Sequence, residues 1–442
     1  MSQSPPARKS NIDSTVSSER EPKMKPTNNK SKRIIAGLVC LLALAANATA
    51  VDNSSARAAA MGGAYTALAS GPAAPRFNPA NLALKNYKNT GIELVGVGAS
   101  VTNNSFTLAD YNKYSGAFLS DADKSDILGK IPEEGLKLSA DVDASTAAIA
   151  LGSFAISMTG SAAADLNLNK ELVDLVLNGN TYADTIDVTG SYANGLSYAS
   201  AGVSYGLSLF RQGSRQLAVG ATGRYLRGIA IEEVTDLQGG IATYANGFAG
   251  AGHVIARTAT GGAGYAVDLG AALKLNNTYT IGAKIESFLS QLKWDHKPEE
   301  RGYVFSFDSM TVDNSDADYV TSDEYTKDIP AFTTTLPARL TVGIGKTQGK
   351  LIWGVDWEQG FRTSPGASTK PRLSAGTELS LIPMIPLRAG YAVGGGGHSA
   401  VSFGAGLKLL GYYLDAAVVS GSTFSAYSSR GVNVAFSTGI LF

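Results

Sequence analysis

Apolar residues alternate with small or polar residues along most of the chain from Gly91 onward. In residues 265–275, every second side chain is Tyr, Val, Leu or Ala, and those between them are Ala, Asp, Gly or Lys. A period of two is typical of a β-strand whose two faces meet different surroundings. The pattern predicts about 14 strands. We place them at residues 90–101, 137–150, 153–165, 185–210, 215–228, 265–275, 279–289, 334–346, 350–359, 372–381, 387–393, 399–409, 412–419 and 431–442.

The second face of these strands differs from the surface of a soluble β-sandwich. It carries Gly, Ala and Ser with single charges, where a soluble sheet would carry many Lys, Glu and Thr. This favours a closed barrel with lipid outside and a crowded polar interior. The predicted inward charges have both signs, so we expect them to form pairs and not to line a wide ion-selective pore. They are Asp268, Lys274, Lys284, Glu286, Arg339, Asp356, Glu358, Arg372, Glu378, Arg388 and Lys408.

Short and long connections alternate between the predicted strands. Membrane barrels have short turns on the periplasmic side and longer loops outside, which predicts long extracellular loops near 226–264 and 290–333. The 185–210 stretch exceeds the about 9–11 residues that cross a bilayer. We expect a kink at Gly190 or at Asn194-Gly195, which would be a candidate lateral opening. Alternatively the stretch is two strands, which would shift the strand count.

Residues 51–88 precede the alternating pattern and differ from it. Ala and Leu recur at helical spacing from Ala56 to Leu68, Gly71-Pro72 interrupts them, and Asn78-Pro79-Ala80 predicts a turn. Met61-Gly62-Gly63-Ala64 followed by Asn78-Pro79-Ala80 resembles the N-terminal hatch of the outer-membrane long-chain fatty-acid transporter superfamily. The other matching residues are Arg57 and Ala67. That superfamily includes barrels linked to type IX secretion and uncharacterised Bacteroidota-type relatives. From the residues alone, an ordinary Ala-rich helix and turn packed on a domain remains an alternative.

The resemblance implies an all-β fold, a transmembrane antiparallel β-barrel of about 14 strands with a small helical hatch inside. Residues 51–88 would form the hatch and residues 89–442 the barrel. The resemblance also implies passage of hydrophobic small molecules through the outer membrane, since burial favours an apolar solute by about 0.8 kcal/mol per methylene. The residues we expect along the path are Met61, Tyr65, Leu68, Phe77, Asn78, Pro79 and Ala80. Plain packing of the hatch against the wall would also explain them.

Two other functions stay open. The first is an interaction barrel that serves protein secretion or surface anchoring without transport. An apolar cavity would favour transport, whereas an interior filled by charge pairs with large ordered outer loops would favour partner binding. The second is an outer-membrane hydrolase, because residues 202–206 read Gly-Val-Ser-Tyr-Gly. That pattern needs a strand-to-helix turn and a His partner for Ser204, so we expect no catalytic site.

The N-terminus predicts export. Lys30, Lys32 and Arg33 precede an apolar run, and Ala48-Thr49-Ala50 fits a cleavage site, so residues 1–50 are a predicted signal peptide and the expected location is the bacterial outer membrane. Met24 is an alternative start. Cleavage would remove Cys40, the one cysteine, and leave 29 Lys and Arg against 34 Asp and Glu. This mildly acidic balance gives no indication of nucleic-acid binding.

The sequence also allows predictions about partners and metal sites. We expect contact with outer-membrane lipids and lipopolysaccharide, and recognition of the terminal Phe442 by the barrel-insertion machinery. His253, His296 and His398 lack metal-ligand spacing. Asp313, Asp316 and Asp318 lack the glycine and the final Glu of a calcium-binding loop, so a solvated acidic loop is the simpler interpretation. We therefore expect no metal and no cofactor.

Overall fold

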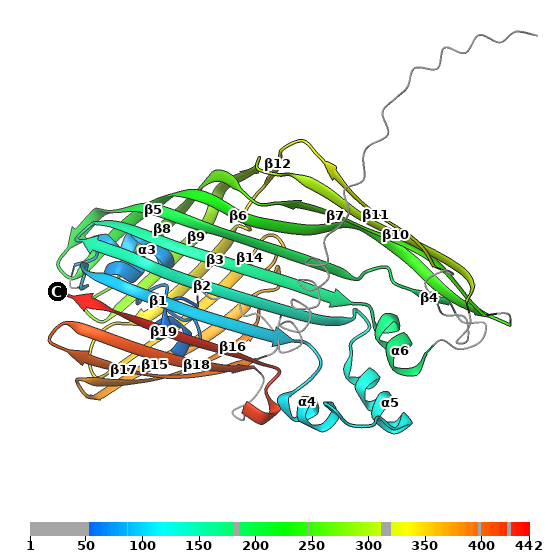
Figure 1. Cartoon of the computed structure of the whole chain (residues 1–442). Helices are drawn as coiled ribbons and strands as arrows, with labels where there is room; N and C mark the ends of the chain where they lie inside the picture. The colour runs from blue at the N-terminus through cyan, green and yellow to red at the C-terminus, as the bar shows by residue number, and fades with distance from the viewer. Residues whose placement is uncertain are drawn as a thin grey trace, which may run out of the picture. The chain divides into compact units, whose positions relative to one another are not determined.

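The computed structural model describes residues 53–85, 87–179, 185–245, 247–310, 320–396, 399–421 and 426–442 (Figure 1). The predicted signal peptide, with Met24, Cys40 and the cleavage site at Ala50, lies outside the described residues. The same holds for His398 and for the acidic run Asp313, Asp316 and Asp318. These predictions therefore stay untested.

Fourteen antiparallel strands form one closed wall in the described part of the chain. The ring closes where β1 pairs with β19, from Gly91 opposite Leu441 to Thr102 opposite Gly431. The predicted all-β barrel of about 14 strands is confirmed. In order around the wall the strands are β1 (Thr90–Asn103), β2 (Leu136–Leu151), β3 (Phe154–Leu168), β5 (Tyr192–Gln212), β6 (Arg215–Tyr244), β8 (Gly262–Lys274), β9 (Tyr279–Trp294), β13 (Arg339–Lys346), β14 (Leu351–Gly360), β15 (Arg372–Ile382), β16 (Ile385–Gly394), β17 (Ala400–Leu409), β18 (Tyr412–Gly421) and β19 (Gly431–Leu441).

The outer face of the wall carries the apolar half of the alternating pattern. On β5, Val203 and Tyr205 are 52% and 55% exposed, whereas Ser204 between them is fully buried. Because the same alternation recurs on the other strands, the barrel presents oily side chains outward and small or polar side chains inward. This distribution is that of a barrel surrounded by lipid.

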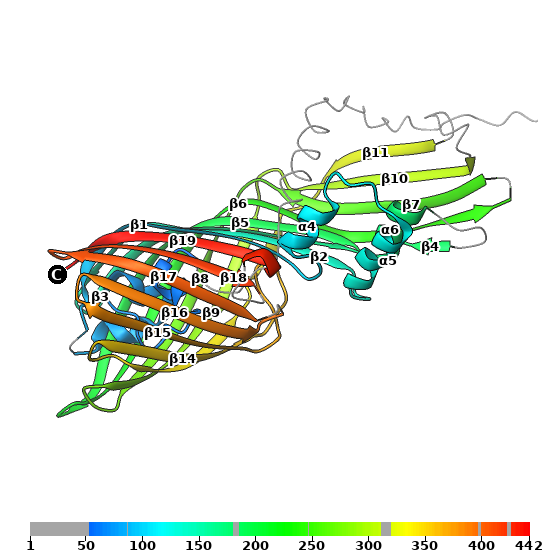
Figure 2. The same ribbon diagram turned by 90° about the horizontal axis from the view of Figure 1, so that it is seen from below.

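A second sheet continues from the wall at the end away from the C-terminus (Figures 1 and 2). The far half of β6 leaves the ring and pairs with β7, β7 pairs with β10, and β10 pairs with β11. The added strands are β4 (Thr185–Asp187), β7 (Gly247–Ala259), β10 (Glu299–Met310), β11 (Val320–Asp328) and β12 (Phe332–Thr334). The regions expected as loops near 226–264 and 290–333 thus contain regular strands, which we call the outer sheet. The short β12 pairs with the end of β9 instead.

The predicted single strand at 185–210 is two strands. The chain breaks at residues 188–191, where Gly190 has φ +88°, and β4 pairs with β6 in the outer sheet. Asn194 and Gly195 lie within β5 and pair without a break with Asp165 and Ala164 of β3. The break therefore does not open the wall, and the number of wall strands stays at 14 because β4 is not one of them.

Short helices occur in the N-terminal segment and in the connections. The first group is α2 (Ala56–Ala60), η1 (Gly71–Ala73), α3 (Ala74–Phe77) and η2 (Pro79–Ala83), and the second is α4 (Leu108–Tyr114), α5 (Asp121–Lys130), α6 (Lys170–Asn178) and η4 (Ala426–Ser428). Thr107 and Ser120 begin α4 and α5 with capping boxes that satisfy the first backbone N–H groups. No helix among the described residues is long and apolar enough to cross a membrane.

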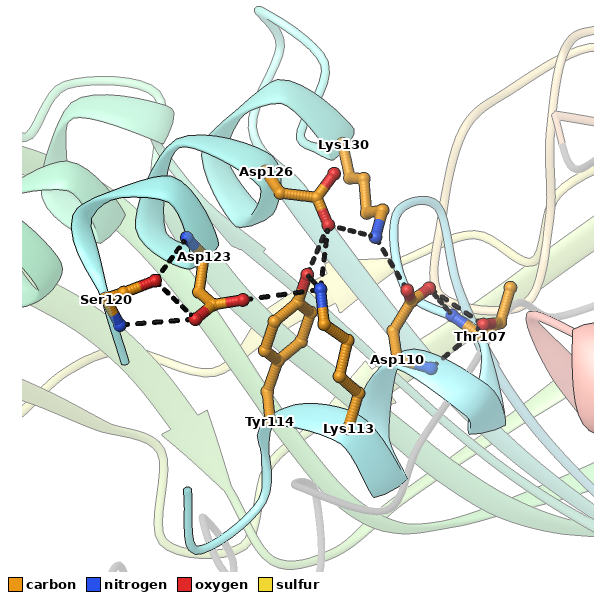
Figure 3. A network of polar contacts seen from close by, with 8 residues as sticks. All are labelled: Thr107, Asp110, Lys113, Tyr114, Ser120, Asp123, Asp126 and Lys130. Carbon is orange, nitrogen blue, oxygen red and sulfur yellow. Dashed lines mark hydrogen bonds and ion pairs between the residues drawn. The ribbon is translucent and has the colours of Figure 1, made fainter. Parts of the chain in front are cut away.

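A polar network joins α4 to α5 between β1 and β2 (Figure 3). Lys130 Nζ lies 2.7 Å from Asp110 Oδ1 on α4 and 2.8 Å from Asp126 Oδ2 on its own helix. Tyr114 donates its hydroxyl hydrogen to the same carboxylate of Asp126. Lys113 also lies 3.3 Å from Asp123. These polar contacts therefore tie the two helices to each other.

Candidate functional site

The N-terminal segment, residues 53–84, packs on the inner face of the wall (blue in Figure 1). Helix α2 contacts β16 to β19, η1 contacts β1 to β3, and η2 contacts β5, β6 and β8. The side chains of Met61, Asn78 and Ala80 are fully buried there. The segment therefore touches strands on all sides of the ring.

Wall glycines make room for this segment. At eleven of them, on ten strands, an added Cβ would come within 3.0 Å of an atom of residues 53–84. At Gly206 the Cβ would lie 2.8 Å from the backbone nitrogen of Ala83, and at Gly354 it would lie 2.7 Å from the carbonyl oxygen of Ala64. Glycine inside a strand often marks such a close backbone approach. We call this set the glycine belt; it comprises Gly96, Gly98, Gly206, Gly220, Gly270, Gly282, Gly345, Gly354, Gly376, Gly390 and Gly404.

Polar side chains of the wall fix the segment in place. Asp356 Oδ2 accepts hydrogen bonds from the backbone N–H groups of Tyr65 and Thr66, at 2.9 and 2.8 Å. Arg372 donates to the carbonyl oxygen of Gly62 at 2.7 Å. Because buried backbone groups need partners, these bonds replace the secondary-structure bonds that the irregular segment lacks.

Most of the predicted inward charges form ion pairs, as expected, whereas Lys274, Asp356 and Arg372 bind backbone groups of residues 62–85 instead. Glu378 Oε2 lies 2.8 Å from Arg388 Nε and 2.7 Å from Arg57 Nε of the segment, and all but Arg57 are almost fully buried. Arg388 also binds Asp415 at 2.7 Å, and Lys408 lies 3.3 Å from Glu378. The other pairs are Arg339 with Glu286 and Glu358, Lys284 with Glu286, and Asp268 with Arg224.

The residues predicted to line a ligand path pack mainly against one another. Met61, Tyr65, Leu68 and Phe77 belong to one apolar cluster, in which the rings of Tyr65 and Phe77 meet edge to face at 5.1 Å. Asn78 Nδ2 donates to the carbonyl oxygen of Ala271 on β8 at 2.9 Å. Pro79 and Ala80 lie against Gly220 of β6. Of the seven predicted residues, Phe77 alone lines the cavity described next, and a role in ligand passage stays a prediction.

A cavity of about 200 Å³ lies between the segment and the outer part of the barrel. The inner faces of the surrounding strands supply most of the walls, and the segment contributes Asn53, Ser54, Gly63, Thr66, Pro75, Arg76 and Phe77. Asp141, Asp143, Arg224, Asp268, Lys284, Glu286, Arg339, Glu358 and Arg372 are the charged residues of those walls. The apolar lumen that would favour hydrocarbon transport is thus only partly present.

Apolar side chains border this cavity on one side. Leu336 lines it and belongs to a buried cluster with Leu226, Leu292 and Trp294, against which Leu196 and Tyr198 pack. The indole N–H of Trp294 donates to Thr334 Oγ1 at 2.9 Å. We call this set, with Ile231, Ala259, Ala266 and Phe332, the apolar cluster.

The sequence interpretation missed most of the residues that surround the cavity. Asp141, Asp143, Arg224 and Tyr198 occupy inward strand positions, but the predicted inward charges began only at Asp268. Their charge at inward positions of β2 and β6 could have identified Asp141, Asp143 and Arg224 as residues of the interior. No sequence pattern indicated that Leu336 would line the cavity, because this residue lies in an irregular connection.

The hydrolase pattern does not form a catalytic site among the described residues. Ser204 lies on the inner face of β5, fully buried, and its Oγ is 2.8 Å from Thr222 Oγ1. His253 pairs with Asp236 in the outer sheet at 2.8 Å. Within the described ranges, no group of three His, Cys, Asp or Glu residues could hold a metal ion.

Comparison with known proteins agrees with this architecture. The toluene transporter TbuX of Ralstonia pickettii matches 89% of this chain and 99% of its own length at 15% identity, with a TM-score of 0.52. The deltaS2 mutant of TodX, a monoaromatic hydrocarbon channel, matches 89% of this chain and 99% of its own at 14% identity, with a TM-score of 0.54. TodX itself is from Pseudomonas putida. At these identities the similarity establishes the fold.

Sequence comparison gives the family. Curated protein sequences contain no match. Residues 79–411, which cover most of the chain, match the model of a family of unknown function, DUF5723. The chain therefore belongs to the DUF5723 family, and it shares the barrel fold of the toluene transporter TbuX and of the TodX mutant.

Proposed function

We propose that this protein is a plugged channel of the bacterial outer membrane that passes small molecules with an apolar part. The observation that carries the proposal is the position of the apolar cluster. Its members Leu336, Leu196 and Tyr198 border a cavity that ends on Phe77 of the N-terminal segment. An apolar solute that enters from the side of the long connections would meet this cluster before the segment.

The fold supports the same function. The similar barrels are described as a toluene transporter and a monoaromatic hydrocarbon channel. In this chain the segment fills the barrel next to the short turns, so passage requires the segment or the wall to move. The cavity of about 200 Å³ is smaller than the roughly 300–1,000 Å³ of pockets for drug-sized ligands. The proposed solute is therefore a small molecule.

Uptake of labelled toluene by cells that express the barrel tests the proposal. Ala163 of β3 lines the cavity, and its neighbour Ala162 lies exposed on the outer face of the same strand. Ala163→Trp should reduce uptake severalfold by filling the cavity, whereas Ala162→Trp adds the same bulk outside and should leave uptake unchanged. Equal uptake by cells with and without the wild-type barrel would refute the channel.

One observation favours the alternative of an interaction barrel, although the comparisons give it no support. The outer sheet is regular, and its last strand β11 pairs on one side only in the described part of the chain. An exposed strand edge can accept a strand from a partner. If the sheet serves only a partner, removal of residues 300–327 should leave toluene uptake unchanged. Loss of uptake on this removal would assign the sheet to the channel.

A further inference from the structure

One carboxylate of the cavity has no positively charged partner. Asp141 of β2 lines the cavity with 8% of its surface exposed. Its Oδ2 has no hydrogen-bond partner among the described residues. The charged side chains that act on it are Asp143 and Asp165, both of the same sign. A buried carboxylate is costly unless it is paired, so this site lacks a cation.

A close backbone contact keeps water from Asp141. Gly366, in the connection between β14 and β15, has φ +71°, and an added Cβ would lie 2.7 Å from Asp141 Oδ1. The connection thus covers the carboxylate on one side, and Asp141 is also among the residues that line the cavity. A ligand in that cavity would lie beside this residue.

The strand register sets apolar groups at a fixed distance from this charge. Asp141 pairs with Ala163 of β3, and Ala163 pairs with Leu196 of β5. Neighbouring strands are about 4.8 Å apart, so Asp141 and Leu196 are separated by about 10 Å. The next row in the same direction is Asp143, Ser161 and Tyr198. Small side chains lie between the acidic and the apolar strand in both rows. Gly366 lies close over Ala163 of the first row, where its added Cβ would be 3.3 Å from the Ala163 Cβ, so the room for a ligand is over Ser161 of the second row.

The basic residues of the cavity already have partners. Arg224 lies 2.8 Å from Asp268, Arg339 lies 2.7 Å from Glu286, and Lys284 lies 3.3 Å from Glu286. Arg76 of the segment lies 2.9 Å from Glu93, and Arg372 donates to the carbonyl oxygen of Gly62 at 2.7 Å. An anionic ligand would therefore compete with carboxylates of the wall, or at Arg372 with a backbone carbonyl. A cationic ligand at Asp141 would displace no partner of that residue, so the cavity favours a positive charge.

We propose that the cavity binds a small organic cation, an alkylammonium or arylalkylammonium ion. Its ammonium group donates hydrogen bonds to Asp141, and its apolar group packs against Leu196 and Tyr198. A charge-assisted hydrogen bond in a site shielded from water is the strongest contact available to such a ligand. The inference rests on the proposed channel function and deepens it by naming the class of solute.

Titration calorimetry of the full chain in detergent tests this binding. The probes are 2-phenylethylammonium chloride, the uncharged ethylbenzene and the anion 3-phenylpropanoate. The ammonium ion should bind at least tenfold more tightly than either of the other two. Asp141→Asn should lower its affinity at least tenfold, whereas Glu134→Gln, in an exposed connection, should not change it. If the unmodified protein binds the ammonium ion and ethylbenzene equally well, the proposal is overturned.

A second variant and an uptake measurement separate the possible failures. Leu196→Ser should weaken 2-phenylethylammonium but not methylammonium, which has no group to reach β5; equal weakening of both would contradict the proposed orientation. Asp141→Asn should retain toluene uptake, because a hydrocarbon needs no carboxylate. Toluene uptake without ammonium binding would overturn this inference alone. Ammonium binding without any toluene uptake would overturn the channel and leave the cation site in place.

Discussion

Arg57 of the N-terminal segment binds Glu378 of β15 through a single oxygen, with Nε 2.7 Å from Oε2. Arg388 binds the same oxygen at 2.8 Å. Glu378 therefore joins the segment to a basic residue of the wall, and its loss affects both Arg57 and Arg388.

This sharing predicts unequal effects of two changes that each remove one charge. Glu378→Gln leaves Arg57 and Arg388 without their common partner and should destabilise the barrel by about 3–5 kcal/mol. Arg57→Gln should cost clearly less, because Arg388 and Lys408 still neutralise Glu378. Guanidinium unfolding of the purified barrel in detergent measures both. Glu133→Gln, at an exposed ion pair, is the control, and equal losses for the first two variants would contradict the arrangement.

The glycine belt predicts that one methyl group can displace the segment. Gly220→Ala would place Cβ 2.7 Å from the carbonyl oxygen of Pro79, and should destabilise the protein by about 1–3 kcal/mol through overpacking. Gly223→Ala on the same strand meets open space and is the matched control. Amide exchange of residues 53–84 should become faster in the first variant only. Unchanged exchange in Gly220→Ala would show that the segment adapts freely.

An engineered disulfide between the N-terminal segment and the wall tests whether the segment moves during passage. The Cβ atom of Ala67 and a Cβ built at Gly345 lie 3.4 Å apart, close to the usual disulfide separation of about 3.5–4.5 Å. With Cys40 replaced by Ser, oxidised Ala67→Cys with Gly345→Cys should block toluene uptake, and a reducing agent should restore it. The two single variants under the same oxidation are the controls. Full uptake in the locked barrel would mean that solutes leave through the wall.

The helical connection predicts a response to acid that the barrel does not share. Lys130 and Tyr114 lower the pKa of Asp126 to about 2, and hydrogen bonding to Ser120 lowers the pKa of Asp123. Since these pKa values are lower in the folded than in the unfolded state, the stabilisation is present above about pH 4 and is lost as the pH falls toward 2. Pepsin should therefore cut residues 104–135 at pH 2.5 but not at pH 4.5.

Two controls accompany that experiment. Asp126→Asn should remove most of the pH dependence, because the ion pair with Lys130 is then absent at every pH. The heat-dependent migration of the barrel in detergent gels should be the same at both pH values. Cleavage that does not depend on pH would contradict the role of this network.

Much of the wall was predictable because lipid and the crowded interior impose different side chains on alternate positions. The stretch 399–409, for example, became β17 within one residue, since Phe403 and Leu407, which are about half exposed, could only face outward. The outer sheet was missed, because strands outside the membrane have no such contrast between faces. In β7, most side chains are Gly and Ala, and the aromatic alternation of Tyr303, Phe305 and Phe307 in β10 was the one available signal.

The candidate site was harder to predict than the fold. Pairing of the inward charges followed from the cost of burying them, and it could be expected before any partner was known. The row from Asp141 through Ala163 to Leu196 depends on the register of three strands. A shift by one residue would turn Asp141 outward, and no local pattern fixes that register.

The glycine belt also limits how such a channel can open. The glycines meet backbone or side-chain atoms of residues 53–84, and the contacts are distributed around the circumference. A piston-like slide along the barrel axis would press the segment against the larger inward side chains on either side of the belt. Opening must therefore proceed by local unwinding of the short helical turns, or by a change in the wall, and not by translation of the segment as a rigid body.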